Sequence, residues 1–531
     1  MGTRHVPVLV VGGGPVGLAT ALFLTHWGIR PLVVDKRDPT LAPPRAGVSL
    51  RTLELFRPLG LVPALEEVGW KAYQPMRTVF KDSGLGTTQH RGDLPPRYAQ
   101  RLRTCGPIDH RQALNQDSLQ RVLLAQVRRR GGEVRFGTRL VGFEAGADEV
   151  RAQLVDTATG ERRETRSAYL IGADGASSGV RQQLGIGMPD REVLARLNTA
   201  FFRADLGPVL EEWRSQLCLV RNSAVHAALL AKNGRDQWSS HIMDYPGKPA
   251  ELTELSPART VELLRAAIGD PTIPIELLAV NGWEASYGLA ASFRQGRVFL
   301  AGDAAHVQSS AGGLGMNTGI QDGHNLAWKL AAVLRGHASP TLLDSYHPER
   351  RAAAQASLRL SRSMHQGYQS PDADPTRLYE RIAVDYLRAM MFYRYPTGAL
   401  LAEDPERGEP DVLSDHARVG CRLPHRWLPG GDGQVSTLDL TGTGWTVLTG
   451  PAGGQWRSAA TAVVAALGIE LRVEHLPGGE TAEALGIDPT GAVLVRPDGF
   501  VAWRTTAPGP DPTALLHQVL GTVLGRDRAS C

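Results

Sequence analysis

The N-terminal segment constrains the fold of this chain more than any other part of its sequence. An apolar run over 6–11 predicts a buried strand, and Gly12-Gly13-Gly14-Pro15-Val16-Gly17 connects it to a predicted helix over 15–27. A second apolar run over 31–34 ends at Asp35. Two parallel strands joined by one helix through short connections make a βαβ unit. The sequence therefore predicts an α/β fold with a Rossmann-like sheet.

The glycines and Asp35 have the spacing of a dinucleotide-binding site. Gly12 allows the tight turn, Gly14 lets the backbone approach a pyrophosphate, and Gly17 allows the helix to pack closely on the sheet. The helix N-terminus offers free N–H groups to phosphates. Asp35 is placed to accept hydrogen bonds from ribose hydroxyls. The alternative is a tight glycine turn without a ligand.

Two later segments also run from an apolar strand into glycine and aspartate. The run over 168–171 leads into Gly172-Ala173-Asp174-Gly175, and the run over 297–301 leads into Gly302-Asp303. A glycine-rich loop and a predicted helix over 317–334 follow the second of these. A carboxylate and a helix N-terminus so far from the first site suit a large cofactor whose two ends are held separately.

Composition indicates a large globular protein and excludes several functions. The length of 531 residues corresponds to roughly three domains of about 150 residues. A net charge of +4 is small for this length, so we expect no nucleic-acid partner. The sequence contains no run of about 18 apolar residues, so we expect no membrane span. The cysteines lie far apart and form no Cys-x-x-Cys pair, which argues against a metal site and fits the cytoplasm.

The pattern along the chain predicts three domains. Residues 1–184 and 284–400 form a discontinuous domain that carries all three glycine-aspartate segments. Residues 185–283 alternate between apolar and polar side chains like hairpin strands, which predicts an inserted sheet-rich domain. A break rich in proline, glycine and charge over 402–410 is the predicted linker. A small domain with an αβ pattern follows over 411–531.

The three segments resemble, in order and spacing, the signatures of the class A flavoprotein aromatic monooxygenases. Further similar stretches are Pro44-Arg45-Ala46-Gly47, Arg51–Leu55, Asn317–Asp322 and Leu343–Arg350. Stretches at 420–425, 436–440 and 495–499 resemble the subgroup of aromatic polyketide and phenol hydroxylases. The resemblance covers nearly the whole chain. It implies a Rossmann-like FAD-binding domain of the glutathione-reductase type, an inserted substrate domain, and a C-terminal thioredoxin-like domain.

The resemblance also implies roles for individual residues. It places the ADP half of FAD at the fingerprint, the ribitol at Asp303, and the flavin ring at the first turn of the helix after the glycine-rich loop. The implied cofactor-binding residues are Gly12, Gly14, Pro15, Val16, Gly17, Asp35, Lys36, Arg45, Gln116, Leu140, Asp174, Asp303, Gly315, Met316 and Asn317. No metal site and no catalytic side chain is assigned.

The implied activity is hydroxylation of an aromatic substrate in bacterial secondary metabolism. In this family NADPH or NADH reduces non-covalent FAD and leaves, and O2 then forms a flavin C4a-hydroperoxide that transfers oxygen to an electron-rich ring. The expected substrate is a polycyclic polyketide or another phenolic molecule, and the expected assembly is a monomer or homodimer. Alternatives are Baeyer–Villiger oxidation, epoxidation or oxidative decarboxylation, and a flavoprotein that does not oxygenate.

The sequence departs from the family pattern at two places. Ser309 and Ser310 stand where many relatives have proline, in the loop near the active site; this is either neutral variation or an altered pocket. The predicted thioredoxin-like domain has no cysteine pair at 450–456, which predicts a structural or assembly role. The histidines considered, interpreted here as structural, are His110, His241, His306 and His324.

Overall fold

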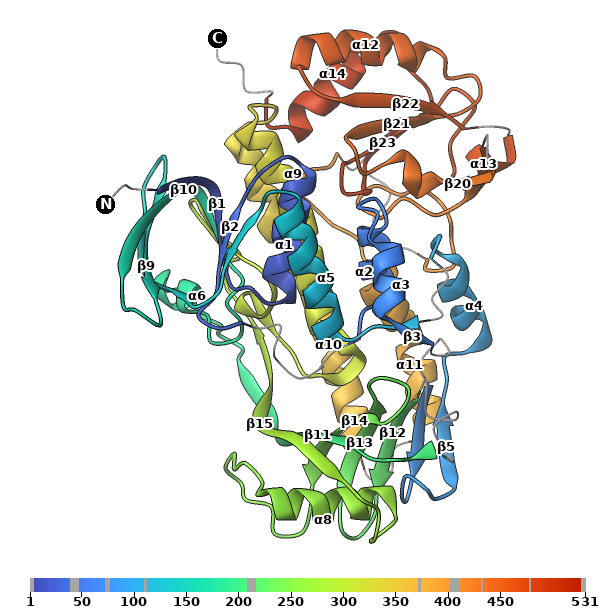
Figure 1. Cartoon of the computed structure of the whole chain (residues 1–531). Helices are drawn as coiled ribbons and strands as arrows, with labels where there is room; N and C mark the ends of the chain where they lie inside the picture. The colour runs from blue at the N-terminus through green and yellow to red at the C-terminus, as the bar shows by residue number, and fades with distance from the viewer. Residues whose placement is uncertain are drawn as a thin grey trace.

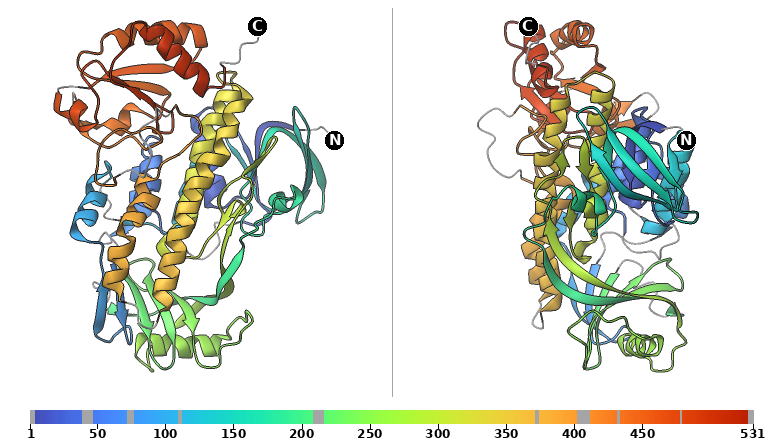
Figure 2. Two further views of the ribbon diagram at one scale, coloured as in Figure 1. Left: turned by 180° about the vertical axis from the view of Figure 1, so that it is seen from behind. Right: turned by 90° about the vertical axis from the view of Figure 1, so that its left-hand side faces the viewer.

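The computed structural model describes residues 4–38, 47–71, 77–108, 112–207, 216–370, 374–401, 411–430, 433–476 and 479–526. Figure 1 shows a central region of sheet and helices, with a second sheet below it and the C-terminal region above it. The long helix α10 (Tyr346–Gln369) extends from the central region to the second sheet, as the rear view in Figure 2 shows. In the part of the chain that the structure describes, no helix is both long and apolar enough to cross a membrane.

A largely parallel sheet forms the core of the central region. Its strands follow the order β16-β17-β10-β1-β2-β7, and β9 and β8 extend it from β10 as antiparallel strands. The strands are β1 (Arg4–Val11), β2 (Leu32–Val34), β7 (Glu133–Arg135), β8 (Thr138–Ala145), β9 (Val150–Asp156), β10 (Arg162–Gly172), β16 (Arg294–Gln295) and β17 (Val298–Leu300). The apolar end of β1 is buried because parallel strands are covered on both faces. The predicted Rossmann-like α/β fold is confirmed.

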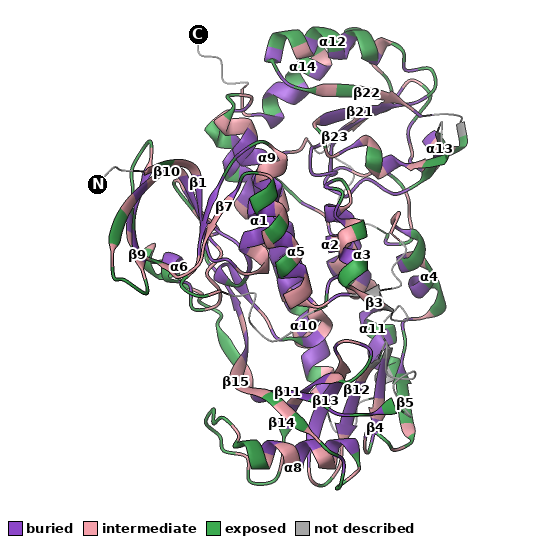
Figure 3. Ribbon diagram, in the orientation of Figure 1, coloured by how far each residue is buried: buried purple, intermediate pink, exposed green. Residues whose placement is uncertain are grey.

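Helices cover this sheet and extend toward the other regions. Helix α1 contacts both α5 and α9. Helices α1 and α9 are largely buried, whereas α5 keeps an exposed face (Figure 3). The helices of the first two regions are α1 (Pro15–His26), α2 (Leu50–Phe56), α3 (Val62–Val68), α4 (Pro96–Thr104), α5 (Gln116–Arg129), α6 (Gly179–Gln183), α8 (Pro257–Ile268), α9 (Gly315–Leu334), α10 and α11 (Pro375–Leu387).

The second sheet has the order β18-β15-β11-β14-β13-β12-β4-β5. Its strands are β4 (Arg77–Lys81), β5 (Thr88–Gly92), β11 (Glu192–Arg203), β12 (Gln216–Arg221), β13 (His226–Ala231), β14 (Gln237–Asp244), β15 (Glu276–Leu289) and β18 (His306–Val307). Strands β4 and β5 lie outside the predicted segment 185–283, yet β4 pairs with β12 in parallel. Pairing between strands so far apart leaves no signal in local periodicity, so the sequence did not indicate it.

The C-terminal region contains a mixed sheet with the order β22-β21-β23-β24. Its elements are β21 (Trp445–Thr449), α12 (Gln455–Leu467), β22 (Leu471–His475), α13 (Gly479–Ala484), β23 (Ala492–Val495), β24 (Val501–Thr505) and α14 (Pro512–Val523). Two small ribbons lie outside the main sheets: β3 (Trp70–Lys71) pairs with β6 (Gln112–Ala113), and β19 (Trp427–Gly430) pairs with β20 (Gly433–Ser436).

A buried set of charges joins the C-terminal region to the central helices. We call it the interface ion network; it consists of Asp322, Lys329, Glu349, Arg350, Arg496 and Asp498. Arg496 reaches out of the C-terminal region and donates to both carboxylate oxygens of Glu349, at 2.8 and 2.9 Å. Lys329 donates to the same carboxylate at 2.7 Å. Cations and carboxylates balance within the network, which is the condition for burying charge.

Candidate active site

A cavity of about 2230 Å³ is lined by residues of both large sheets. Its volume exceeds the roughly 300–1,000 Å³ of a pocket that holds one small ligand. Residues from β1, β2, β8, α9 and the turn that follows β10 line one part, and residues from β11 to β15 line the other. The cavity therefore has room for a large cofactor together with a second ligand.

Glycine is required at the three fingerprint positions for different structural reasons. Gly12 has φ +111°, and a Cβ there would lie 2.2 Å from the carbonyl oxygen of Ala173, at the end of β10. A Cβ at Gly17 would lie 1.8 Å from the carbonyl oxygen of Gly12. At Gly14 no atom lies within 4 Å of the Cβ position. Gly12 and Gly17 thus keep α1 against the sheet, whereas Gly14 leaves an open surface in the cavity.

The start of α1 is suited to bind phosphate. Gly14 is its N-cap residue and no side chain caps it, so its first N–H groups lack partners within the helix. Asp35 stands beside this turn, where its Oδ2 accepts from Gly13 N at 2.7 Å and its Oδ1 from Arg37 N at 2.9 Å. An uncapped N-terminus next to a fixed carboxylate fits a diphosphate joined to a ribose.

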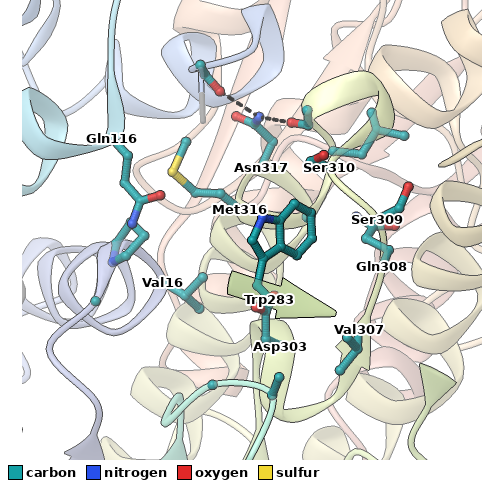
Figure 4. Close-up of a pocket in the computed structure, with 18 of the residues that line it drawn as sticks. Val16, Gln116, Trp283, Asp303, Val307, Gln308, Ser309, Ser310, Met316 and Asn317 are labelled. Carbon is teal, nitrogen blue, oxygen red and sulfur yellow. Dashed lines mark hydrogen bonds between the residues drawn. The ribbon is translucent and has the colours of Figure 1, made fainter. Parts of the chain in front are cut away.

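The second glycine-aspartate turn packs directly on the first. Gly302 has φ +62°, and a Cβ there would lie 2.9 Å from Val16 Cγ2. A Cβ at Gly319 would lie 2.7 Å from Gly302 Cα. These close approaches place Asp303 at the cavity beside the start of α1, and the side chains of Val16 and Asp303 both appear in Figure 4. The first and the last of the three glycine-aspartate segments predicted from the sequence thus meet at one cavity.

Asn317 fixes the loop that precedes α9. Its Oδ1 accepts from Ser49 N at 2.9 Å and from Thr52 Oγ1 at 2.8 Å. Its Nδ2 donates to the carbonyl oxygens of Gly47 and Gly313, at 3.1 and 2.7 Å (Figure 4). The side chain is therefore fully used in the protein, and only backbone groups of this turn remain for a ligand.

Most of the predicted site residues meet in this cavity. Those that line it are Gly12, Gly14, Pro15, Val16, Asp35, Lys36, Gln116, Leu140, Asp174, Asp303, Ser309, Ser310, Gly315, Met316 and Asn317. Gly17 lies beneath them in the contact between helix and strand. Arg45 and His110 lie outside the described residues.

Ser309 attaches its loop to α10. The hydroxyl oxygens of Ser309 and Ser361 are 3.0 Å apart, and Ser361 Oγ also lies 3.1 Å from the carbonyl oxygen of Ser309. Ala311 N donates to Ser309 Oγ at 3.3 Å. The side chain is buried, whereas Ser310 is exposed. Hydrogen bonds to α10 thus restrain this loop.

Replacing Ser309 with alanine should lower the free energy of unfolding by about 1 kcal/mol, because the hydrogen bonds to α10 are lost. Replacing the neighbouring Ser310 with alanine should change it by less than about 0.5 kcal/mol. Urea denaturation of the two holoprotein variants measures the difference. Equal stability of the two variants would show that the attachment to α10 contributes nothing.

His306 has the packed role expected from the sequence. It is fully buried, and its Nε2 lies 2.7 Å from Asp322 Oδ2. The same carboxylate accepts from Gly302 N at 3.0 Å and from Arg350 Nε at 2.7 Å. Burial opposes ionisation of Asp322, but His306 and Arg350 outweigh burial and hold the pKa of that carboxyl below its usual range. His306 and Asp322 therefore support the Gly302 turn from behind.

The second sheet contributes cavity residues for which the sequence predicted no ligand-binding role. Thr199, His241 and Trp283 lie on three different strands and line the cavity. His241, expected to be structural, is thus on the cavity wall. Trp283 is seen in Figure 4 in the cavity that also contains Met316 and Gln308. Polar residues at alternate positions of otherwise apolar strands were the signal that could have placed Thr199 and His241 on the cavity wall.

Comparison with known protein families accounts for nearly the whole chain. Residues 5–361 match the family described as "FAD binding domain", and residues 416–527 match the family described as "Aromatic-ring hydroxylase, C-terminal". The chain belongs to the FAD-dependent aromatic hydroxylases. It is an enzyme, a flavoprotein monooxygenase that uses FAD, O2 and a reduced nicotinamide co-substrate.

Individual relatives of this hydroxylase are similar over their full length. It is 36% identical to aklavinone 12-hydroxylase RdmE of Streptomyces purpurascens, covering 99% of this chain and 100% of the relative. It is 35% identical to tetracenomycin A2 monooxygenase-dioxygenase of Streptomyces glaucescens, over 99% and 98% of the two chains. A solved ternary complex of aklavinone-11 hydroxylase with FAD and aklavinone superposes with a TM-score of 0.89 at 35% identity, over 99% and 100% of the chains.

The unpaired polar groups of the cavity suit an organic cofactor that forms hydrogen bonds. Asp174 Oδ1 is buried without a hydrogen-bond partner among the described residues, and so is Gln308 Nε2. Both residues line the cavity. Within the described ranges, no cluster of three or more His, Cys, Asp or Glu is arranged to hold a metal ion. The hydroxylase thus offers hydrogen bonds and an uncapped helix start to its cofactor.

Proposed function

We propose that this hydroxylase transfers one oxygen atom of O2 to a fused-ring aromatic polyketide in bacterial secondary metabolism. One observation carries the proposal: a single cavity of about 2230 Å³ joins the cofactor-side glycine turns to an apolar sheet wall. The relatives named for aklavinone and tetracenomycin support a ligand of this kind. A small phenol leaves most of such a wall uncovered.

We assign the cofactor by the polar groups of the first sheet. The start of α1 and Gly14 hold the diphosphate, and Asp35 holds the adenosine ribose. Asp303 holds the ribitol. The first turn of α9 at Gly315 directs backbone N–H groups toward the flavin ring, where its positive dipole stabilises negative charge. Arg45, outside the described residues, is assigned to the same cofactor.

The sheet wall and α10 position the aromatic substrate and exclude water from it. Apolar side chains line the cavity from the sheet, from α10, and from α11 and the turn after it; they include Leu197, Phe201, Leu217, Leu219, Leu230, Met243, Met364, Tyr386 and Met390. When bound, FAD accepts a hydride from NADPH or NADH and activates O2 for transfer to the ring. A dry, apolar wall keeps the ring in place and limits loss of activated oxygen to water.

Oxygen consumption tests the proposal. The holoenzyme, with NADPH or NADH in separate arms, should consume O2 and nicotinamide in equal amounts when a fused-ring hydroxyquinone is added. Mass spectrometry with labelled O2 should find one labelled oxygen in the product, and NMR should place it as a ring hydroxyl. A ring-expanded lactone would establish Baeyer–Villiger oxidation instead. Lack of stimulation by every aromatic compound tested would refute the monooxygenase assignment.

We also infer that the hydroxylase acts in the cytoplasm as a monomer or homodimer. Its four cysteines have no redox-motif spacing, which fits a reducing compartment. Light scattering on the purified holoenzyme measures the assembly, and a larger oligomer would contradict this inference.

A further inference from the structure

Strand alternation gives the second sheet one face toward the cavity and one toward α8. On β11, Thr199 and Phe201 line the cavity. Their neighbours Ala200 and Phe202 pack in the hydrophobic cluster that includes residues of α8. Because side chains alternate along a strand, the cavity wall is a defined set of positions. Most of these wall positions are apolar, so we ask what the few polar side chains of the wall can bind.

Three of these polar members form a continuous hydrogen-bonded relay. Trp283 Nε1 donates to Thr199 Oγ1 at 2.8 Å. Thr199 Oγ1 lies 2.8 Å from His241 Nδ1. The sheet register places Thr199 opposite His241, and the His241 and Trp283 rings meet edge to face with centroids 6.1 Å apart. We call Trp283, Thr199 and His241 the wall relay.

The hydrogen-bonding capacities of the three groups favour one arrangement of protons in the wall relay. An indole N–H can only donate, so Thr199 Oγ1 is the acceptor from Trp283. With Trp283 as its donor, the Thr199 hydroxyl can give its own proton to His241 Nδ1, and no other acceptor for that proton is found in the described part of the chain. His241 Nδ1 is then unprotonated, so Nε2 carries the proton.

The surroundings of His241 keep its ring neutral. Burial, and then the positive charge of Lys232, lower the pKa of His241 to about 4. A neutral ring with an acceptor Nδ1 has one remaining group, the Nε2–H donor. Nε2 has no hydrogen-bond partner among the described residues. The wall relay therefore ends in a donor at the cavity wall.

A second unused polar group lies on the same strand. Ser239 is two residues before His241 on β14, lines the cavity and is 1% exposed. Its hydroxyl has no hydrogen-bond partner among the described residues. The register places it between Phe201 and Leu230, which also line the cavity. The Cα atoms of residues two apart on a strand are about 7 Å from each other, and two polar side chains so spaced in an apolar wall are the arrangement that orients a ligand.

We propose that the wall relay and Ser239 form a subsite for the carbonyl oxygen of a fused-ring quinone, with His241 as a neutral hydrogen-bond donor. The subsite orients the ring system against the apolar wall, and His241 positions the substrate without taking a proton from it. This inference rests on the proposed function and specifies the chemical feature that the substrate must have.

Ligand binding to the holoenzyme without nicotinamide tests the subsite. The probes are 1,4-dihydroxyanthraquinone, which has carbonyl oxygens, and anthracene, which has none. Changes in flavin absorbance or fluorescence give Kd for each. His241→Leu should raise the Kd of the quinone at least tenfold and that of anthracene less than twofold. His241→Gln, whose amide N–H reaches a similar position, should restore the quinone Kd to within threefold of the original.

A second variant and a matched control make the test independent of one substitution. Thr199→Val is isosteric and frees Nδ1 of His241 to take the proton, so the quinone Kd should rise about threefold to tenfold. His90 is exposed on β5 of the same sheet, outside the cavity, and His90→Leu should leave both Kd values unchanged. Retained FAD absorbance and melting temperature exclude misfolding as the cause.

The alternative outcomes are distinct. An unchanged quinone Kd in both His241→Leu and Thr199→Val would overturn the subsite. An equal loss of quinone and anthracene binding would show a packing effect and would also overturn it. Turnover lost in His241→Gln while binding is kept would show that His241 transfers a proton. Binding is measured without O2 uptake, so failure of the proposed function gives a different result from failure of the subsite.

Discussion

Replacing Gly17 with alanine should produce a protein that does not retain FAD. The new methyl carbon would lie 1.8 Å from the carbonyl oxygen of Gly12 and 3.4 Å from Val10 Cγ1. A clash with backbone cannot be relieved by changing a rotamer, so α1 must move away from β1 and carry its N-terminus out of place. Misplacement by about 1 Å costs roughly 100-fold in activity, and we expect at least this loss in O2 uptake together with loss of flavin absorbance.

Replacing Gly14 with alanine should separate cofactor binding from folding. No atom lies within 4 Å of the Cβ position at Gly14, so the free energy of unfolding of the apoprotein should change by less than about 0.5 kcal/mol. The methyl group enters the cavity where we assign the diphosphate, so the Kd for FAD should rise roughly 100-fold, or about 2.7 kcal/mol. Fluorescence titration of apoprotein with FAD measures it.

Gly187 provides the control for both glycine variants. It is exposed, does not line the cavity and has no atom within 4 Å of its Cβ position. Gly187→Ala should match the original protein in stability and in FAD affinity. Tight FAD binding by Gly14→Ala would show that the phosphates do not approach this backbone. Normal folding and FAD binding by Gly17→Ala would contradict the packing of α1 on β1.

Replacing Glu349 with glutamine should destabilise the whole protein. Glu349 is fully buried and accepts from Arg496, Lys329 and the backbone N–H of Ala399. An amide cannot balance two buried cations, and breaking such a pair costs about 3–5 kcal/mol. Urea denaturation followed by tryptophan fluorescence measures the loss. Glu66 is exposed on α3, and Glu66→Gln should change stability by less than about 0.5 kcal/mol.

The same carboxylate predicts how stability depends on pH. Burial opposes its ionisation, but Arg496 and Lys329 outweigh burial and lower the pKa of Glu349 from 4.5 to about 2. The folded-state pKa is the lower one, so the stabilisation is complete above about pH 4.5 and is lost as the pH falls toward 2. The original protein should lose stability steeply in this window, whereas Glu349→Gln should lack that component. Parallel curves for the two proteins would contradict the role of the network.

The sequence predicted which glycine and aspartate residues meet at the cavity because their positions depend on local rules. A strand that ends in glycine and aspartate places its polar residues at the carboxyl edge of a parallel sheet, and such edges coincide. Gly12, Asp174 and Asp303 therefore meet at one cavity although they come from distant segments. The FAD-binding family and the fold followed from the same motifs.

The cavity wall formed by the second sheet, which we assign to the substrate, could not be predicted in the same way. Contact between Thr199 and His241 depends on the order and register of β11 and β14, which no local pattern encodes. The pair of Arg496 and Glu349 spans 147 residues and two regions of the fold. The hydrogen bond between Ser309 and Ser361 could not be predicted either, because it depends on the position of α10. Long-range geometry decides each of these features.

The alternation on β11 has a consequence for how enzymes of this shape can change substrate. Thr199 and Phe201 face the cavity, while Ala200 and Phe202 belong to the core under α8. Mutations at the first kind of position change what the ligand meets, whereas mutations at the second kind change the stability of the sheet. A mutant library confined to every other residue of the wall strands should therefore yield mostly folded proteins with different ligand preferences. One sheet can in this way acquire new substrates by point mutation without rebuilding its core.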